Sequence, residues 1–119
     1  MVLAIVDDLM FASKIKTAAA QLGLTVSFAR SSGAAMTAIR DNTPTLVILD
    51  LNNPRTDPLG TVAAIKGDPA TRAIRTVGYA SHVQTDVIEA ARLAGVDEVM
   101  ARSAFTARLP EILAAARSA

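Results

Sequence analysis

Three aspartates follow two short apolar segments of this 119-residue chain. Asp7 and Asp8 follow the apolar residues 2–6, and Asp50 ends the run that starts at position 45. If both runs are strands of one sheet, the carboxylates lie at the same edge. Clustered acids with no opposite charge are unfavourable unless a hard divalent cation binds them, and oxygen ligands suit Mg²⁺. Mg²⁺ beside an exposed nucleophilic carboxylate favours phosphoryl chemistry at an aspartate.

Helix capping is the alternative explanation for these aspartates. Asp is common after a strand because its side chain accepts hydrogen bonds from the first turn of the next helix. Capping accounts well for any one of the three, but less well for all three together at the ends of two apolar runs. Asp8 suits both roles, as a metal ligand and as the N-cap of the helix that follows.

The bulk properties indicate one globular domain over residues 1–119. The length suffices for one core and is too short for two, and 51% hydrophobic against 19% charged residues excludes disorder. A net charge of +1 gives no electrostatic reason to expect nucleic acid or an anionic membrane as partner. The apolar start is interrupted by Asp7, so it is neither a signal peptide nor a membrane span. The absence of cysteine fits a reducing cytoplasm.

Apolar runs alternate with amphipathic segments five times along the chain. Short apolar runs predict strands at residues 2–6, 24–29, 45–49, 76–80 and 96–101. All but the second run are near-continuously apolar, as expected for a sheet covered on both faces. The amphipathic spacing predicts helices at residues 9–22, from Ser31 or Ser32 onward, and at about 59–66, 85–93 and 105–117. Pro110 would mark the first turn of the last helix or a kink within it.

Five strand–helix units predict an α/β fold, a doubly wound five-stranded parallel sheet, (βα)5, with right-handed crossovers and helices on both faces. In such sheets the ligand site lies beyond the carboxyl ends of the strands, near the switch in strand order. The three aspartates are all at carboxyl ends. The fold pattern and the chemistry therefore point to the same place.

The chain resembles the receiver domain of bacterial two-component response regulators, the CheY-like family. The likeness spans the whole chain and is carried by the pair Asp7–Asp8, the segment 46–54 (LVILDLNNP) and the segment 94–98 (AGVDE). Asp50 follows Asp8 by 42 positions, a spacing typical of the family. The resemblance implies a flavodoxin-like sheet with strand order 2-1-3-4-5.

The resemblance also implies a phosphorelay function. Asp50 would accept the phosphoryl group from a histidine kinase or a phosphotransfer protein. Asp8 and Asp50 would bind Mg²⁺ directly, Asp7 through water, and Asn52 through its backbone carbonyl. Output would pass through contacts with a downstream protein partner, and the only chemistry would be self-phosphorylation and dephosphorylation at Asp50. Pro54 would hold the tight turn after the site.

The sequence departs from the family pattern at the switch positions. The usual Ser or Thr is Ala80, with Ser81 as a possible substitute, and the usual Lys is Arg102. Arg keeps the charge but is planar and bulkier, so the exchange is not conservative. The usual cis proline is Ser103, for which we expect a trans bond. The switch aromatic of the last strand corresponds to Val99.

These departures leave other interpretations open. The chain could be an atypical receiver that acts as a phosphorylation-independent interaction module, with Arg102 lying across the acid pocket as an internal cation in a salt bridge to Asp50. A partner surface would involve Val83, Val87, Val99 and Ala101, and a homodimer through the fourth and fifth helices is plausible. His82 and Asn52 are candidates for influencing how fast an acyl phosphate hydrolyses. A dehalogenase-type hydrolase would need an acid at position 52 and is disfavoured.

Overall fold

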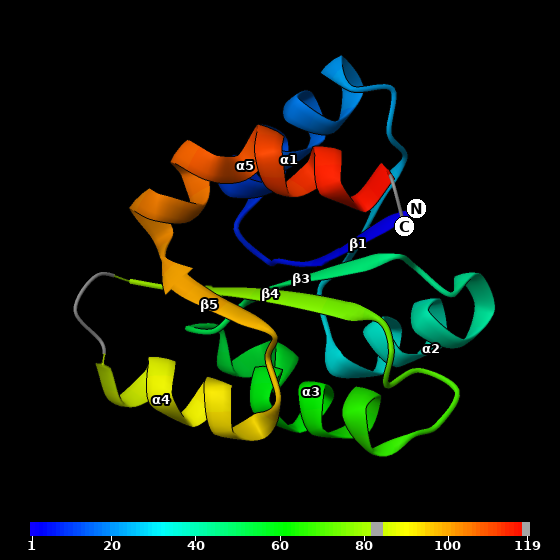
Figure 1. Cartoon of the computed structure of the whole chain (residues 1–119), viewed down its shortest axis with the longest axis vertical. Coiled ribbons are helices and arrows are strands. Elements are labelled where there is room, and N and C mark those ends of the chain that lie inside the picture. The colour runs from blue at the N-terminus through cyan, green and yellow to red at the C-terminus, as the bar shows by residue number, and fades with distance from the viewer. Residues whose placement is uncertain (82–84, 118–119) are drawn as a thin grey trace.

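The computed structural model describes residues 1–81 and 85–117, which form five parallel strands and five α-helices (Figure 1). The strands are β1 (Val2–Ile5), β2 (Val26–Ala29), β3 (Leu46–Asp50), β4 (Arg75–Ala80) and β5 (Glu98–Ala101). They pair in the order β2-β1-β3-β4-β5. The predicted doubly wound, flavodoxin-like topology is therefore confirmed.

The helices cover both faces of the sheet. They are α1 (Leu9–Gln21), α2 (Ser32–Asn42), α3 (Pro58–Gly67), α4 (Thr85–Ala94) and α5 (Arg102–Arg117), with a short 3-10 helix η1 (Pro54–Thr56) between β3 and α3. Helices α1 and α5 lie on one face and α2, α3 and α4 on the other (Figure 1). Val2 and Ala4 belong to the core under α1 and α5, while Leu3 and Ile5 belong to the opposite core. Alternate residues of a strand point to opposite faces, so a wholly apolar strand serves both cores.

Local signals start and stop the helices as the sequence predicts. The Asp8 side chain caps α1 and the Ser31 hydroxyl caps α2, each accepting hydrogen bonds from backbone N–H groups of the first turn. After α4 the backbone of Gly95 adopts a φ of 111°, in a region where a side chain would be strained. A Cβ there would also lie 3.1 Å from Lys66 Cγ, so glycine suits both the turn and the packing.

Helix α5 departs from its predicted start. It begins at Arg102, directly after β5, and Pro110 lies inside it rather than in its first turn. Phe105, Leu109 and Leu113 from this helix are buried against the sheet. That packing holds the segment helical although proline lacks one backbone donor. Strands β2 and β5 each begin two residues later than predicted, at Val26 and Glu98.

No helix in the described part of the chain is both long enough and apolar enough to cross a membrane.

Candidate functional site

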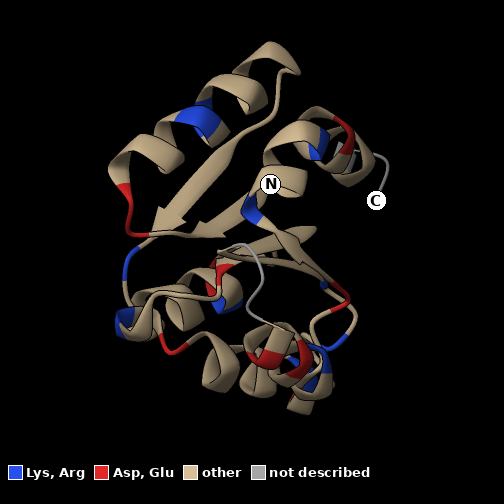
Figure 2. Cartoon of the chain, turned by 90° about the vertical axis from the view of Figure 1, so that its left-hand side faces the viewer, with Lys and Arg blue, Asp and Glu red and all other residues tan. Residues whose placement is uncertain are grey.

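The carboxyl ends of the central strands bring the predicted site residues to one edge of the sheet. Asp50 is the last residue of β3, and Asp7 and Asp8 follow β1, which pairs directly with β3. Figure 2 views this side of the molecule and shows acidic and basic segments next to one another around the strand ends. The predicted clustering of carboxylates at this edge is therefore correct, but basic residues accompany it.

Asp7 is bound by two arginines. Arg30 Nε lies 2.8 Å from Asp7 Oδ1, and Arg55 Nη1 lies 2.9 Å from Asp7 Oδ2. The hydrogen bond from Arg30 lowers the pKa of Asp7 most, and the charge of Arg55 lowers it further against partial burial. Sequence reasoning missed both arginines. Arg30 directly follows the second strand, so its position at this edge was available as a signal, whereas the position of Arg55 depends on the turn η1.

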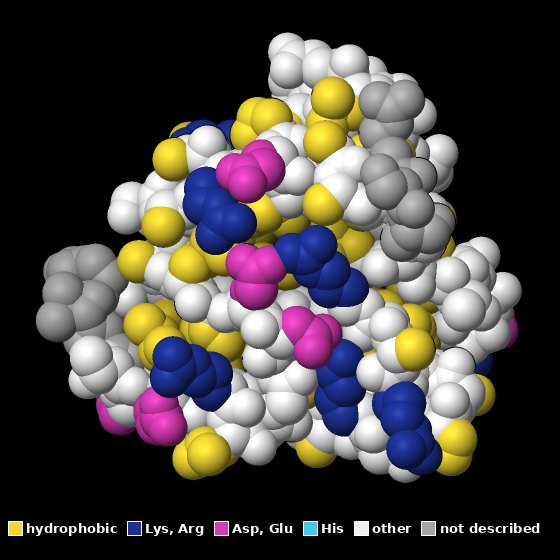
Figure 3. All heavy atoms as spheres, in the orientation of Figure 1, with side chains coloured by type: hydrophobic (Ala, Val, Ile, Leu, Met, Phe, Trp, Pro, Cys, Tyr) yellow, Lys and Arg dark blue, Asp and Glu magenta, His cyan; other side chains and the backbone are white. Residues whose placement is uncertain are grey.

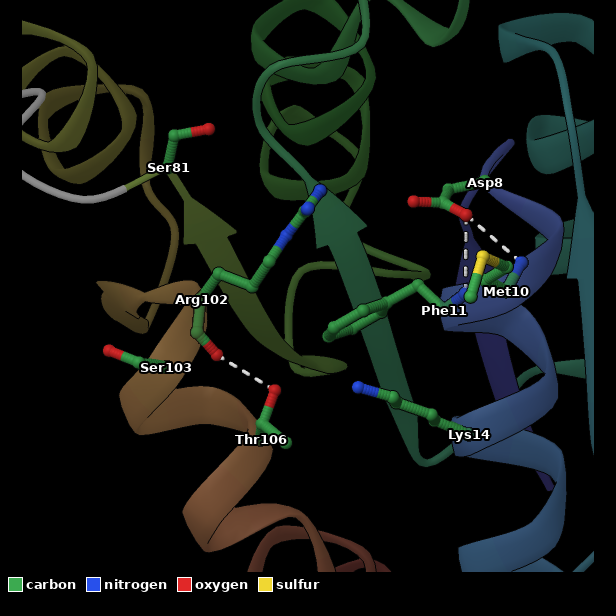
Figure 4. A pocket seen from close by; sticks show the side chains of 8 residues that line it. All are labelled: Asp8, Met10, Phe11, Lys14, Ser81, Arg102, Ser103 and Thr106. Carbon is green, nitrogen blue, oxygen red and sulfur yellow. Dashed lines mark hydrogen bonds between the residues drawn. The ribbon is translucent and has the colours of Figure 1, made fainter.

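Asp8 caps helix α1, which confirms the capping role predicted for it from the sequence. Its Oδ1 accepts hydrogen bonds from the backbone N–H groups of Met10, at 2.9 Å, and Phe11, at 3.3 Å. The other carboxylate oxygen points away from the helix on the pocket side (Figure 4). Capping therefore uses one oxygen of Asp8 and leaves the other available for a ligand.

Asp50 is the most buried carboxylate of the site, with 6% of its surface exposed. Burial raises the pKa of Asp50 above its ordinary value, against the lowering effects of the Asn52 backbone hydrogen bond and the charge of Arg102. That hydrogen bond runs from Asn52 N to Asp50 Oδ1 over 3.0 Å. The Asn52 side chain accepts a hydrogen bond from Ser81 N at 2.6 Å, which ties the loop after β3 to the end of β4.

Arg102 lies over aromatic rings and makes no salt bridge with Asp50. Its guanidinium carbon is 5.2 Å from the Phe11 ring centroid and 5.7 Å from that of Tyr79, both within cation–π range. Among residues 1–81 and 85–117, no ion pair joins Arg102 to any carboxylate, and its buried Nε has no hydrogen-bond partner. The predicted Arg102–Asp50 salt bridge is therefore wrong in this state. The Phe11 and Tyr79 rings, which are tilted against each other with centroids 4.7 Å apart, offer the guanidinium an alternative contact.

The other switch positions surround a pocket of about 690 Å³ between the starts of α1 and α5. Arg102 crosses this pocket between Ser81 and Phe11, with its guanidinium toward the strand ends (Figure 4). Ser81 and Ser103 line it, whereas Ala80 is fully buried at the end of β4. The peptide bond before Ser103 is trans, as expected. Because α5 begins at Arg102, the loop predicted after the last strand is replaced by helix.

The predicted partner surface is only partly a surface. Val87 and Val99 are half-buried and pack against the core under α3 and α4, and Ala101 is half-buried at the end of β5. Val83, like His82, lies outside the described residues. Basic and acidic side chains alternate over the face that carries β5 (Figure 3). Four ion pairs involve residues of β5 or segments close to it: Arg75–Glu98, Arg108–Glu98, Arg108–Glu111 and Lys66–Asp97. Such charges protect an exposed edge strand from pairing with another chain.

The charge balance of the site differs from the expected one. The premise that Asp7, Asp8 and Asp50 form a cluster with no opposite charge of its own is wrong. Arg30 and Arg55 bind Asp7 directly, and Arg102 acts on Asp50 through its charge. Two guanidinium groups therefore lie on Asp7, and a third lowers the pKa of Asp50 through its charge.

The carboxylates of the site fit a divalent cation only in part. Within the described ranges, no group of three or more His, Cys, Asp or Glu side chains is placed to hold a metal ion. Asp8 and Asp50 each keep one carboxylate oxygen without a hydrogen bond or ion pair to the described residues, and the two groups repel each other electrostatically. These two oxygens fit a hard cation. Asp7 could contribute to such a site only if Arg30 or Arg55 released one of its carboxylate oxygens.

Comparisons with known proteins were made at the level of sequence and of structure. No protein-family model matches the sequence, and no curated protein matches it. Among solved structures, the phosphorylated cyanobacterial phytochrome response regulator RcpA superposes with a TM-score of 0.79 at 26% identity, over 94% of this chain and 86% of that chain. A response regulator from Hahella chejuensis gives a TM-score of 0.86 at 19% identity, over 97% and 92% of the two chains.

A third match concerns a metal-bound structure. The Mn²⁺-bound form of the response regulator Rcp1 gives a TM-score of 0.75 at 20% identity, over 93% of this chain and 89% of that chain. These matches cover nearly the whole of each protein and agree with the five-stranded fold of this chain. The chain therefore has the fold of response-regulator receiver domains and is similar to them over nearly its whole length.

Proposed function

We propose that this receiver domain accepts a phosphoryl group on Asp50 and signals through protein contacts in a two-component system. The observation that supports the proposal most directly is the placement of Asp50. It ends β3 beside a pocket that contains Asp8, Ser81 and Arg102. The solved relative RcpA is described as phosphorylated, and it is similar to this chain over 94% of the length.

The residues of the site suit a nucleophilic carboxylate. Asn52 N holds Asp50 Oδ1, which leaves Oδ2 to attack phosphorus. As the O–P bond forms, the N–P bond of a phosphohistidine breaks and its electron pair returns to the histidine nitrogen. Arg102 would move away from the Phe11 and Tyr79 rings and bind the phosphoryl oxygens, since a guanidinium can donate two parallel hydrogen bonds to a phosphate. The Arg102 side chain would thus serve in place of the usual lysine, with Ser81 substituting for the hydroxyl missing at Ala80.

The proposed cofactor is Mg²⁺. Asp8 and Asp50 would hold it through the carboxylate oxygens that remain available, with the backbone carbonyl of Asn52 as a further ligand and Asp7 through water. When bound, the cation offsets charge that develops on the transferred group. The Mn²⁺-bound form of Rcp1 supports a divalent cation in a protein of this fold.

The partners follow from the same proposal. A histidine kinase or phosphotransfer protein would supply the phosphoryl group in the cytoplasm, and a downstream protein would recognise the changed domain around Val87, Val99 and Ala101. Nucleic acid and membranes are not proposed partners. Homodimerisation through α4 and α5 would be a second form of output.

A second candidate function rests on the arginines. Arg30 and Arg55 already bind Asp7, and the charge of Arg102 acts on Asp50, so the chain supplies its own positive charge to the site without any ligand. An atypical receiver that binds its partner without phosphorylation would keep this arrangement.

The test is intact-mass spectrometry after incubation with Mg²⁺ and acetyl phosphate. We expect wild-type protein to gain one labile phosphoryl group and Asp50→Asn to gain none. Asp41→Asn, an exposed acid on α2, is the matched control and should be labelled like wild type. No adduct on wild type, or an adduct that survives in Asp50→Asn, would overturn the phospho-acceptor assignment and leave the phosphorylation-independent module.

A further inference from the structure

The two arginines on Asp7 come from loops that are separate in sequence. Arg30 follows β2, and Arg55 belongs to η1 after β3, so each approaches Asp7 from its own side and takes its own carboxylate oxygen. The Asp7 side chain is 17% exposed, whereas those of Arg30 and Arg55 are 61% and 74% exposed. The carboxylate is thus fixed at the base of the site, and the two cations that cover it can move into solvent.

A hard cation and these arginines would compete for the same charge. Both Asp7 oxygens are occupied by guanidinium groups, and a cation bound at Asp8 and Asp50 would also be repelled by them. Exposed ion pairs of this kind are individually weak, so a cation can displace them at a modest cost in affinity.

We propose that Arg30 and Arg55 act as internal cations that compete with a divalent metal ion for Asp7, and so set the cation affinity of the receiver site. The inference rests on the proposed cation site at Asp8 and Asp50. Releasing either arginine would also free the loop that carries it. Cation binding would therefore be coupled to the loops that follow β2 and β3.

Calorimetric titration of the full chain with Mn²⁺ at about 0.1 M salt tests the proposal, since that ionic strength screens charges more than about 10 Å apart. We expect Arg30→Gln/Arg55→Gln to bind Mn²⁺ about tenfold more tightly than wild type, and each single variant about threefold more tightly. The matched control is Arg40→Gln/Arg72→Gln, which removes the same net charge. Both residues are exposed and lie toward the amino-terminal ends of the strands, and the control should change affinity less than about twofold.

Asp8→Asn distinguishes a failure of the arginine competition from a failure of the proposed cation site. Suppose that wild type binds Mn²⁺, that Asp8→Asn abolishes this binding, and that the double arginine variant binds with unchanged affinity. The proposed competition is then wrong, while the proposed cation site stands. An equal gain of Mn²⁺ affinity in Arg40→Gln/Arg72→Gln would also overturn the competition, because the effect would then come from net charge alone. If neither wild type nor the double arginine variant binds Mn²⁺, the proposed cation site fails and the competition fails with it.

Discussion

Each end of the parallel sheet holds an aspartate in contact with cations, and the two arrangements differ in which partner is buried. At the amino-terminal end, Asp97 Oδ2 accepts hydrogen bonds from Lys66 Nζ at 2.9 Å and from Thr76 N at 2.8 Å. The Lys66 side chain is 21% exposed and the Asp97 side chain 45% exposed. At the carboxyl-terminal end, Asp7 is the more buried partner and its two arginines are mostly in solvent.

The difference separates a structural ion pair from one that can exchange. Lys66 Nζ also donates to the backbone carbonyls of Arg72 and Ile74, so its ammonium group fixes the segment before β4 as well as Asp97. Moving Lys66 would leave several acceptors without a donor. Arg30 and Arg55 each make one hydrogen bond to Asp7, and water can replace that bond. The carboxyl end is therefore the end suited to ligand exchange.

The largest expected effect is at the amino-terminal end. Lys66→Met keeps the apolar stem but removes the ammonium group that serves Asp97 and two carbonyl groups, so we expect the free energy of unfolding to fall by about 2 kcal/mol. Urea denaturation followed by circular dichroism measures it. Lys16→Met on the exposed side of α1 is the control and should change stability by less than about 0.5 kcal/mol. A loss in Lys66→Met no larger than in this control would show that the network is not structural.

An effect of opposite sign is expected at Asp50. Burial raises the pKa of Asp50, so its folded form holds a proton more strongly than the unfolded chain does. The resulting stabilisation is complete well below pH 3.8, the ordinary value, and is lost as the pH rises through the folded pKa. At pH 7 the ionised carboxylate therefore costs stability, and Asp50→Asn should raise the free energy of unfolding by about 1 kcal/mol.

Thermal unfolding of wild type and Asp50→Asn between pH 3 and pH 7 tests whether the substitution raises stability. The advantage of the variant should shrink as the pH falls and Asp50 of wild type becomes protonated. A variant that is less stable than wild type at pH 7 would mean that the neighbouring cations already compensate for the burial of this charge.

The smallest effect is expected at Asp7. Arg30 and Arg55 lower the pKa of Asp7, so the stabilisation from this pair is present above pH 3.8 and is lost as the pH falls through the lower folded value. Asp7→Asn should therefore melt slightly below wild type at pH 7 in low salt. The difference should shrink in about 1 M salt, because salt screens exposed pairs.

Asp41→Asn provides the comparison for Asp7→Asn in the same calorimetric melts, because it removes one exposed carboxylate outside the site. A salt-independent loss in Asp7→Asn would indicate that the two arginines form a fixed structural pair like Lys66, and would remove the contrast between the two ends of the sheet.

Much of the fold was predictable because its signals are local. Short apolar runs, near-continuous in all but the second, identified the five strands, and Asp8 and Ser31 marked helix starts that the structure confirms. The start of α5 was predicted three residues late, at position 105 instead of Arg102, because β5 runs directly into the helix and no turn residue marks the boundary. Burial of Phe105 and Leu109 against the sheet keeps the helix continuous through Pro110. Such packing is a property of the assembled layers and leaves little trace in the spacing of residues.

The sequence by itself determined which acids meet, because strand ends in a parallel sheet converge on one edge. Asp7, Asp8 and Asp50 were placed together on that rule alone. Only the tertiary structure decided what surrounds them. Arg30 and Arg55 reach Asp7 across 23 and 48 positions of sequence, and Arg102 settles on Phe11 and Tyr79 instead of on Asp50. The partner of a long, flexible arginine side chain depends on the folded geometry of several loops. No periodicity in the sequence predicts that partner.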